Sequence, residues 1–252
     1  MFTITSAVYA QKKDTLKITP QNINPKALIP GMHRWLVYAK MGIDSPRNML
    51  SIWSRHIEKK QFEGKEAIEI TQVWEDKDGI MHTTSSISDA KDFHSLYHKS
   101  WWKQSGSSSF NFLTGESSIN DKQLTATDTS ARTRRTREAF DSALTQYTLN
   151  WHLDLEVFPQ LPYQNNRTFM INFYDPGLSK PKWVSYTVTG SGKLPGLDGM
   201  EADCWLLEHN SVFGNTQNKE VFWISKKTKE VLKLEQQFGT RFRYKIKLPY
   251  SL

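Results

Sequence analysis

The chain has 252 residues, of which 38% are hydrophobic and 12% aromatic, and its formal net charge is +7. This length allows one large β domain or two smaller domains, and either can bury a core without disulfide staples. No stretch approaches the ~20 apolar residues of a membrane helix, and no recognition motif accompanies the basic charge, so the sequence predicts neither a transmembrane segment nor a nucleic-acid partner.

The first ten residues, Met1 to Ala10, are uncharged and fairly apolar. Compact residues stand at Val8 and Ala10, and a polar run begins at Gln11. This pattern is typical of the end of a secretory signal peptide that is cleaved after Ala10, although its basic beginning is missing. It predicts a periplasmic or secreted protein, with no cysteine at the cleavage site to carry a lipid. The alternatives are an irregular N-terminus or an added first strand.

Residues 11–31 are polar and contain Pro20, Pro25 and Pro30, which predicts an extended leader without a core of its own. From Met32 onward, short runs of aromatic and β-branched residues are typical of strands. We expect an antiparallel meander of strands over residues 32–40, 49–58, 64–74 and 80–88. Gly79 is placed for the turn before the last of them.

The middle of the chain is less regular. Residues 89–104 allow a short helix with Phe93, Leu96 and Tyr97 on one face, and weak strand patterns follow at 110–112 and 123–127. A helix is predicted to begin near Thr136, which can cap it. Residues 151–157 fit either a strand or a continuation of this helix, and Pro159 ends both versions.

The C-terminal third is predicted to be β throughout, with strands at 167–174, 182–189, 202–209, 220–225, 230–238 and 240–248. The lone Cys204 alternates with Ala202 and Leu206, which indicates a small buried hydrophobe rather than a metal or redox site. No linker divides the chain after residue 31. We therefore expect one β-rich domain over 32–252, with a large curved antiparallel sheet that forms an incomplete barrel under helical cover.

Motifs for chemistry are weak. Gly190 to Lys193 lacks the spacing and the hydroxyl residue of a phosphate-binding loop. His94 and His98, with Asp89 or Asp92, would need a third ligand to hold zinc. His152, Asp154 and Glu156 would share a strand face, either as an acid–base group or as a solvated surface. The sequence thus predicts no catalytic residue, no metal and no cofactor.

Aromatic residues in the predicted strands offer the best candidate for a binding site. Their ordinary role is in a core, but the inner face of a curved sheet can also line an apolar pocket. The candidate ligand-binding residues are Trp35, Trp53, Trp74, Trp101, Trp102, Tyr186, Trp205 and Trp223.

The last strand carries a second candidate surface. Arg241, Arg243, Lys245 and Lys247 alternate with apolar residues and share one face. This basic face is either a solvated outer surface or a contact for lipid phosphates or an acidic partner. A cluster of arginines before the predicted helix allows the same two interpretations; it comprises Arg132, Arg134, Arg135 and Arg137.

The order of several short motifs in the C-terminal half resembles a known family. They run from Leu153 to Pro162, Phe169 to Pro176, Tyr186 to Gly190, Asp203 to Leu206, Phe222 to Ser225, and Glu230 to Lys233. The resemblance is to exported bacterial proteins of unknown function, common in Bacteroidetes, that are related to the LolA/LolB-like lipoprotein carriers. It implies a curved sheet partly closed by helices, a periplasmic or secreted location and a hydrophobic ligand, but no catalytic residues.

Three functions follow as hypotheses. The first is a carrier or sensor that holds a lipid or another hydrophobic molecule in the concavity of the sheet. The second is a cell-envelope interaction module that uses the basic face of the last strand to bind a protein partner. The third is a hydrolase that uses His152, Asp154 and Glu156, which would require these side chains to converge in a cleft.

Overall fold

The computed structural model describes residues 14–196 and 199–249. Its helical segments are η1 Pro20–Asn22, η2 Pro25–Ala27, α1 Ala131–Leu144, η3 Trp151–Leu153, α2 Asp154–Val157 and η4 Phe158–Gln160. The strands are β1 Asp14–Lys17, β2 Gly31–Lys40, β3 Asn48–Phe62, β4 Lys65–Asp76, β5 Gly79–Asp89, β6 Ser95–Trp102, β7 Gly106–Asn111, β8 Glu116–Ile119, β9 Lys122–Gln123, β10 Leu149–Asn150, β11 Arg167–Tyr174, β12 Lys182–Pro195, β13 Glu201–Phe213, β14 Thr216–Ser225, β15 Val231–Phe238 and β16 Arg241–Leu248.

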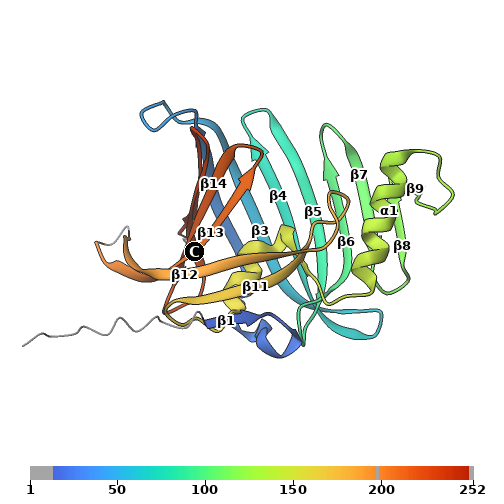
Figure 1. Ribbon diagram of the computed structural model, residues 1–252, viewed down its shortest axis with the longest axis horizontal. Coiled ribbons are helices and arrows are strands. Elements are labelled where there is room, and N and C mark those ends of the chain that lie inside the picture. The colour runs from blue at the N-terminus through green and yellow to red at the C-terminus, as the bar shows by residue number, and fades with distance from the viewer. Residues whose placement is uncertain (1–13, 197–198, 250–252) are drawn as a thin grey trace, which may run out of the picture.

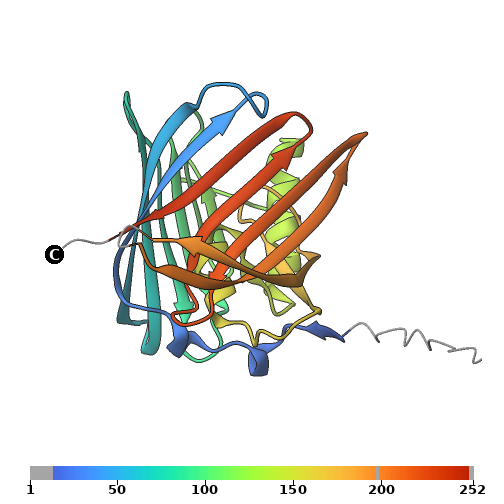
Figure 2. The ribbon, with the colours of Figure 1, turned by 90° about the vertical axis from the view of Figure 1, so that its left-hand side faces the viewer.

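All of these strands belong to one sheet, in the order β1-β11-β12-β13-β14-β15-β16-β2-β3-β4-β5-β6-β7-β8-β9, with β10 also beside β11. Neighbouring strands are antiparallel except that β1 and β10 run parallel to β11. The sheet curls around an interior without closing on itself (Figures 1 and 2). The predicted mainly β fold, with a curved antiparallel sheet that forms an incomplete barrel under helical cover, is confirmed.

Helix α1 lies where the sheet fails to close. It buries Ala139 and Phe140 in a cluster with Phe110 of β7 and Tyr174 of β11, so it bridges two distant parts of the sheet (Figure 1). The helix begins at Ala131, earlier than the predicted start near Thr136. The side chain of Ser130 accepts a hydrogen bond from the Thr133 N–H and caps it instead. The arginine cluster therefore lies within the helix.

The short helical turns η3, α2 and η4 fill the interior of the curved sheet. Phe158 is fully buried, and its ring lies against those of Phe173, Tyr186 and Phe222. A strand over 151–157 is therefore wrong. The Asn150 side chain accepts a hydrogen bond from the His152 N–H and so starts the helical turns.

Two other segments differ from expectation. Residues 95–102 form strand β6 rather than a helix, because Leu96, His98 and Ser100 face inward and alternate with residues of the other face, a period of two that suits a strand. Residues 11–31, predicted as a leader, join the fold in their described part. Strand β1 pairs with β11, and Ile18 and Ile23 are buried in the main core.

The basic face of the last strand turns inward. Arg241, Arg243, Lys245 and Lys247 share a face as predicted, but Lys245 is only 4% exposed. A solvated outer face therefore does not describe the second half of the strand, whereas Arg241 and Arg243 in its first half are exposed. The reason lies in the interior, where Lys245 Nζ is 3.7 Å from Asp154 Oδ2 and 4.5 Å from the centre of the Trp53 ring.

Candidate functional site

An open cavity of about 370 Å³ lies beside strands β12 to β15 at one end of the sheet. Apolar side chains and polar groups both contribute to its lining. The lining residues are Trp151, Lys182, Trp183, Val184, Ser185, His209, Ser211, Phe213, Asn218, Glu220 and Phe238. Its volume falls within the range of about 300–1,000 Å³ that is usual for small-molecule sites.

The polar side of this cavity is fixed by hydrogen bonds. His209 Nδ1 donates to the Ser185 carbonyl at 2.8 Å, and Gln236 Nε2 donates to Glu220 Oε1 at 2.6 Å. Burial raises the pKa of Glu220, while the charges of His209 and Arg243 oppose that shift. One partly desolvated carboxylate beside aromatic walls suits a ligand with an apolar body and a polar end.

A buried network of charges lies between the sheet and the helical turns. Arg55 of β3 is 1% exposed, and its guanidinium contacts Glu156 Oε2 at 2.5 Å and Asp154 Oδ1 at 3.5 Å. Lys245 Nζ of β16 lies 3.7 Å from Asp154 Oδ2 and 4.5 Å from the centre of the Trp53 ring. Burial raises the pKa of Glu156 despite the nearby Arg55 charge. The network ties the helical turns to both β3 and β16.

The amine of Lys245 is expected to titrate near pH 8, because burial lowers its pKa from 10.5 to about 8 against the opposing charge of Asp154. The unfolded state then binds more protons than the folded state between these two values, so stability rises with pH there by about 3 kcal/mol. An NMR titration of the lysine side chains tests this, with the 86% exposed Lys77 as the internal reference. If the titration midpoint of Lys245 equalled that of Lys77, the burial of the Lys245 amine would be contradicted.

The aromatic residues that the sequence predicts as one binding site lie in several separate places in the structure. Trp53 stacks on Trp74 at 3.6 Å, and Trp74 meets Trp102 edge to face at 5.5 Å, so these three form a row across the inner face. Trp101 and Trp102 are sequence neighbours in one strand and must face opposite sides, which places Trp101 on the outer face with 38% exposure. Trp223 also lies on the outer face, next to Phe222, which faces the core.

The other predicted aromatic residues occupy separate places. Trp35 and Tyr186 are buried in the core, and Trp205 packs beside Tyr163. None of the eight predicted residues lines the 370 Å³ cavity, whose tryptophans are Trp151 and Trp183.

Three histidines gather near the inner face. The ring centroid of His152 lies 4.9 Å from that of His98 and 5.6 Å from that of His82. His152 Nε2 lies 3.1 Å from an oxygen of Asp175, and burial lowers the pKa of His82 to about 4. Asp154 and Glu156 belong to the charge network with Arg55 instead, so His152, Asp154 and Glu156 do not form one acid–base group.

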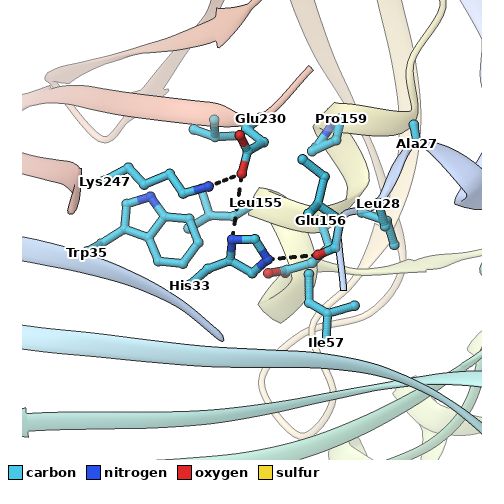
Figure 3. Close-up of a pocket in the computed structure, with 12 residues that line it drawn as sticks. Ala27, Leu28, His33, Trp35, Ile57, Leu155, Glu156, Pro159, Glu230 and Lys247 are labelled. Carbon is cyan, nitrogen blue, oxygen red and sulfur yellow. Dashed lines mark hydrogen bonds and ion pairs between the residues drawn. The ribbon is translucent and has the colours of Figure 1, made fainter. Parts of the chain in front are cut away.

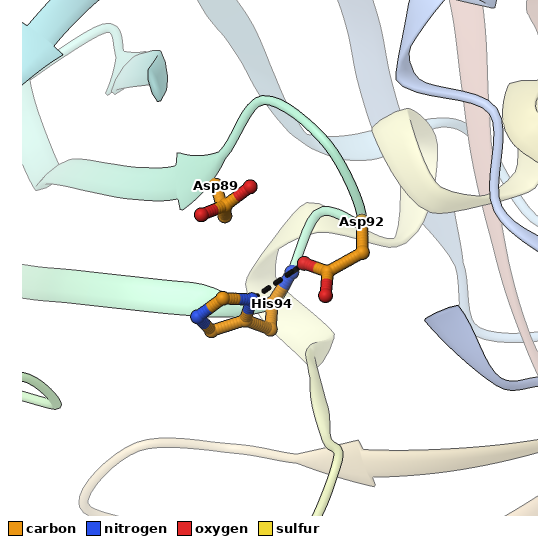
Figure 4. Close-up of side chains that lie close together, drawn as sticks. All are labelled: Asp89, Asp92 and His94. Carbon is orange, nitrogen blue, oxygen red and sulfur yellow. Dashed lines mark hydrogen bonds and ion pairs between the residues drawn. The ribbon is translucent and has the colours of Figure 1, made fainter. Parts of the chain in front are cut away.

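Asp89, Asp92 and His94 lie close together at the turn between β5 and β6 (Figure 4). His94 Nδ1 contacts Asp92 Oδ1 at 2.5 Å, and Asp89 Oδ1 accepts a hydrogen bond from the Lys91 N–H. His98, which the sequence placed near them on a helix, is fully buried on the inner face of β6. The carboxylates serve to hold the turn.

A second, small cavity of about 20 Å³ lies between the N-terminal segment and β2 (Figure 3). Here Glu230 forms an ion pair with Lys247, and His33 Nδ1 lies 3.6 Å from the same carboxylate. This space holds about one water molecule, which is too small for a ligand. The charged side chains around it therefore serve to hold the N-terminal segment and β2 together.

The residues of the larger cavity were missed by sequence reasoning. In the sequence, His209 and Glu220 are ordinary polar residues of predicted strands. Lys182 and Trp151 lie at the ends of predicted strands, where nothing indicates a cavity. The signal that could have identified them is register: His209 pairs with Glu220 directly across β13 and β14 on the face that includes Phe222. That pairing depends on the turn at 214–215, whose position a single strand pattern does not determine.

Comparison with known proteins identifies a family and, among solved structures, a distantly similar lipoprotein. A model of a family described as a protein of unknown function, DUF3108, matches residues 43–247. The chain is also similar to the hypothetical lipoprotein YmcC from Escherichia coli K12, at 13% identity and a TM-score of 0.31, over 88% of this chain and 89% of that one. No curated protein matches. Within the described residues, no helix has the length and apolarity needed to cross a membrane.

Proposed function

Because the chain belongs to the DUF3108 family of proteins of unknown function, its role has to be argued from its own residues, and we propose that it is an exported binding protein for a hydrophobic ligand. The proposed ligand is a lipid or a similar molecule, with its apolar part against Trp151, Phe213 and Phe238. Export to the periplasm or outside the cell rests on the pattern of residues 1–10, which lie outside the described residues. The relationship to the LolA/LolB-like carriers, and to Bacteroidetes, stays a prediction from the sequence.

The cavity beside β12 to β15 is the observation that carries this proposal. It combines a volume of about 370 Å³ with aromatic side chains and the carboxylate of Glu220. Mostly apolar pockets with a few fixed polar groups are the usual form of a small-molecule site. The row of Trp53, Trp74 and Trp102 provides further aromatic surface on the inner face.

Binding is favoured over catalysis by the state of the interior carboxylates. Asp154 and Glu156 both contact Arg55, so neither is placed to activate a substrate. An interaction module that uses the basic face of β16 is favoured less, because Lys245 of that face is buried.

A substitution that narrows the cavity tests the proposal. Ser211 lies on β13 between His209 and Phe213 and lines the cavity. We expect Ser211→Phe to weaken binding of a fluorescent fatty acid by about tenfold, because the added ring fills part of the cavity and a steric cost of roughly 1.4 kcal/mol corresponds to that factor. Fluorescence titration of purified protein measures the change.

Asn210→Phe is the matched control, since Asn210 is exposed and stands next to Ser211 on the opposite face of β13. It should bind the probe as the unaltered protein does. Equal affinity in all three proteins, or no binding by any of them, would refute a ligand site in this cavity.

A further inference from the structure

One edge of the sheet collects six hairpin turns, three of which adjoin the cavity. From β11 to β7 in the sheet order, every strand is antiparallel to its neighbours, so six of the hairpin turns must lie at the same edge. Figure 2 shows hairpins from the blue, teal, orange and red parts of the chain at its top. We define this mouth edge as residues 38–50, 74–81, 100–108, 172–184, 211–218 and 236–243.

Large apolar side chains are exposed mainly at the mouth edge. Of the fifteen exposed large hydrophobic residues in the described part of the chain, eleven belong to it. Phe213 is 77% exposed, and Val212 and Leu178 are each 70% exposed. The others are Met41, Ile43, Met49, Leu50, Ile80, Trp101, Trp183 and Phe238. Exposed apolar groups at this density mark a contact surface.

Cations accompany these apolar side chains. The mouth edge carries eight lysines and arginines against five carboxylates. Among the described residues, Lys77 and Lys180 are the mouth-edge cations that form an ion pair with a carboxylate, so Lys103 and Arg241 belong to the unpaired majority. The cations are Lys40, Arg47, Lys77, Lys103, Lys180, Lys182, Arg241 and Arg243, and the carboxylates are Asp44, Glu75, Asp76, Asp78 and Asp175.

We propose that the mouth edge docks on a phospholipid bilayer with anionic head groups. Exposed apolar side chains interspersed with lysine and arginine suit the head-group region of a bilayer. There the apolar side chains enter the lipid and the cations bind the phosphates. These side chains stand on separate hairpins around a curved rim, so a flat layer can contact many of them at once. A second copy of the chain would contact these side chains only through its own mouth edge. The positive charges of the two edges would then face each other and repel.

The mouth edge lies beyond the proposed ligand site but shares side chains with it. Trp183, Phe213 and Phe238 belong both to the mouth edge and to the lining of the cavity. A protein docked in this way would open its cavity toward the lipid, so a hydrophobic ligand could pass between them without crossing water. Docking itself requires no bound ligand and is tested without one.

Vesicle flotation gives the first test. The purified chain is mixed with vesicles of phosphatidylcholine alone or of phosphatidylcholine with phosphatidylglycerol. We expect Val212→Ser combined with Phe213→Ser to lower the partition coefficient on anionic vesicles by at least about tenfold, because two apolar side chains no longer enter the lipid. Leu113→Ser, at an exposed residue on the opposite edge, should change nothing.

Charge gives an independent readout. Lys103→Gln and Arg241→Gln should each lower binding to anionic vesicles by about fivefold, because one cation near such a surface contributes about that factor. Neither substitution should alter binding to phosphatidylcholine alone. Equal losses on both kinds of vesicle would contradict the role given to these cations.

A site-specific probe locates the contact. Phe213→Cys and Leu113→Cys are each labelled with an environment-sensitive dye, since the native Cys204 is buried. When anionic vesicles are added, only the dye at position 213 should shift its fluorescence emission to the blue. Equal response of both probes, absence of vesicle binding, or a dimer that the Val212 and Phe213 substitutions dissolve would overturn the proposal. Ser211→Phe, which narrows the cavity, should still float, so failure of docking is distinguishable from failure of ligand binding.

Discussion

Replacing Arg55 by methionine is expected to lower the free energy of unfolding by about 3–5 kcal/mol, because it leaves buried carboxylates without their cation. Arg55 is 1% exposed and contacts both Glu156 and Asp154, while Glu156 is itself 1% exposed. Methionine keeps most of the apolar stem of the arginine side chain. The expected loss of stability is therefore due to removal of the charge. Urea unfolding of the two proteins at neutral pH measures the difference.

Two further variants separate charge from packing. Arg34→Met removes an exposed arginine from neighbouring strand β2 and should leave stability within about 0.5 kcal/mol. The double variant Arg55→Met with Glu156→Gln removes both charges and should recover much of the loss. Because burial raises the pKa of Glu156, the penalty in Arg55→Met should also shrink as the pH falls and this carboxylate takes up a proton. A loss that the second substitution leaves unchanged would show that the ion pair is not its cause.

Truncation of Phe158 to alanine should cost about 3–5 kcal/mol of unfolding free energy, because it opens a cavity in the centre of the fold. The ring is fully buried and lies 4.6 Å from the ring of Phe222 and 4.9 Å from that of Tyr186. It therefore anchors the helical turns to strands β12 and β14. Thermal and urea unfolding of the variant give the magnitude.

Phe213→Ala makes the same chemical change at a side chain that is 77% exposed. Its stability should change by less than about 0.5 kcal/mol, since little packing is lost. Equal losses at positions 158 and 213 would contradict the assignment of the helical turns to the core and of the β13–β14 turn to an exposed edge.

Most of the sheet was predictable because strand periodicity is local. The alternation in Thr240 to Leu248 and in Arg167 to Tyr174 indicated strands, and the structure has strands over nearly the same residues. Residues 151–157 could not be assigned, because an alternating apolar pattern also occurs in short helical turns buried on several sides. In the structure the Asn150 side chain accepts a hydrogen bond from the His152 N–H at the start of these turns, and their apolar residues are buried in the main core.

The candidate site was less predictable because it depends on which face of the sheet is concave. The four basic residues of the last strand were correctly placed on one face, but their direction followed from Asp154 and the Trp53 ring, far away in the sequence. The tryptophans were identified as candidates by residue type alone, which does not separate Trp102 on the inner face from Trp101 on the outer one. The cavity with Glu220 and His209 arises from strand register, which no single strand encodes.

Native mass spectrometry of the purified chain shows whether the cavity beside β12 to β15 holds a hydrophobic ligand. The protein is sprayed as isolated and again after incubation with a fatty acid, and solvent extraction identifies what it carried. We predict an added mass that matches an extracted acyl lipid, or uptake of the fatty acid, with both lost in Ser211→Phe. A bare protein mass, with no uptake of the offered lipid, would contradict the account.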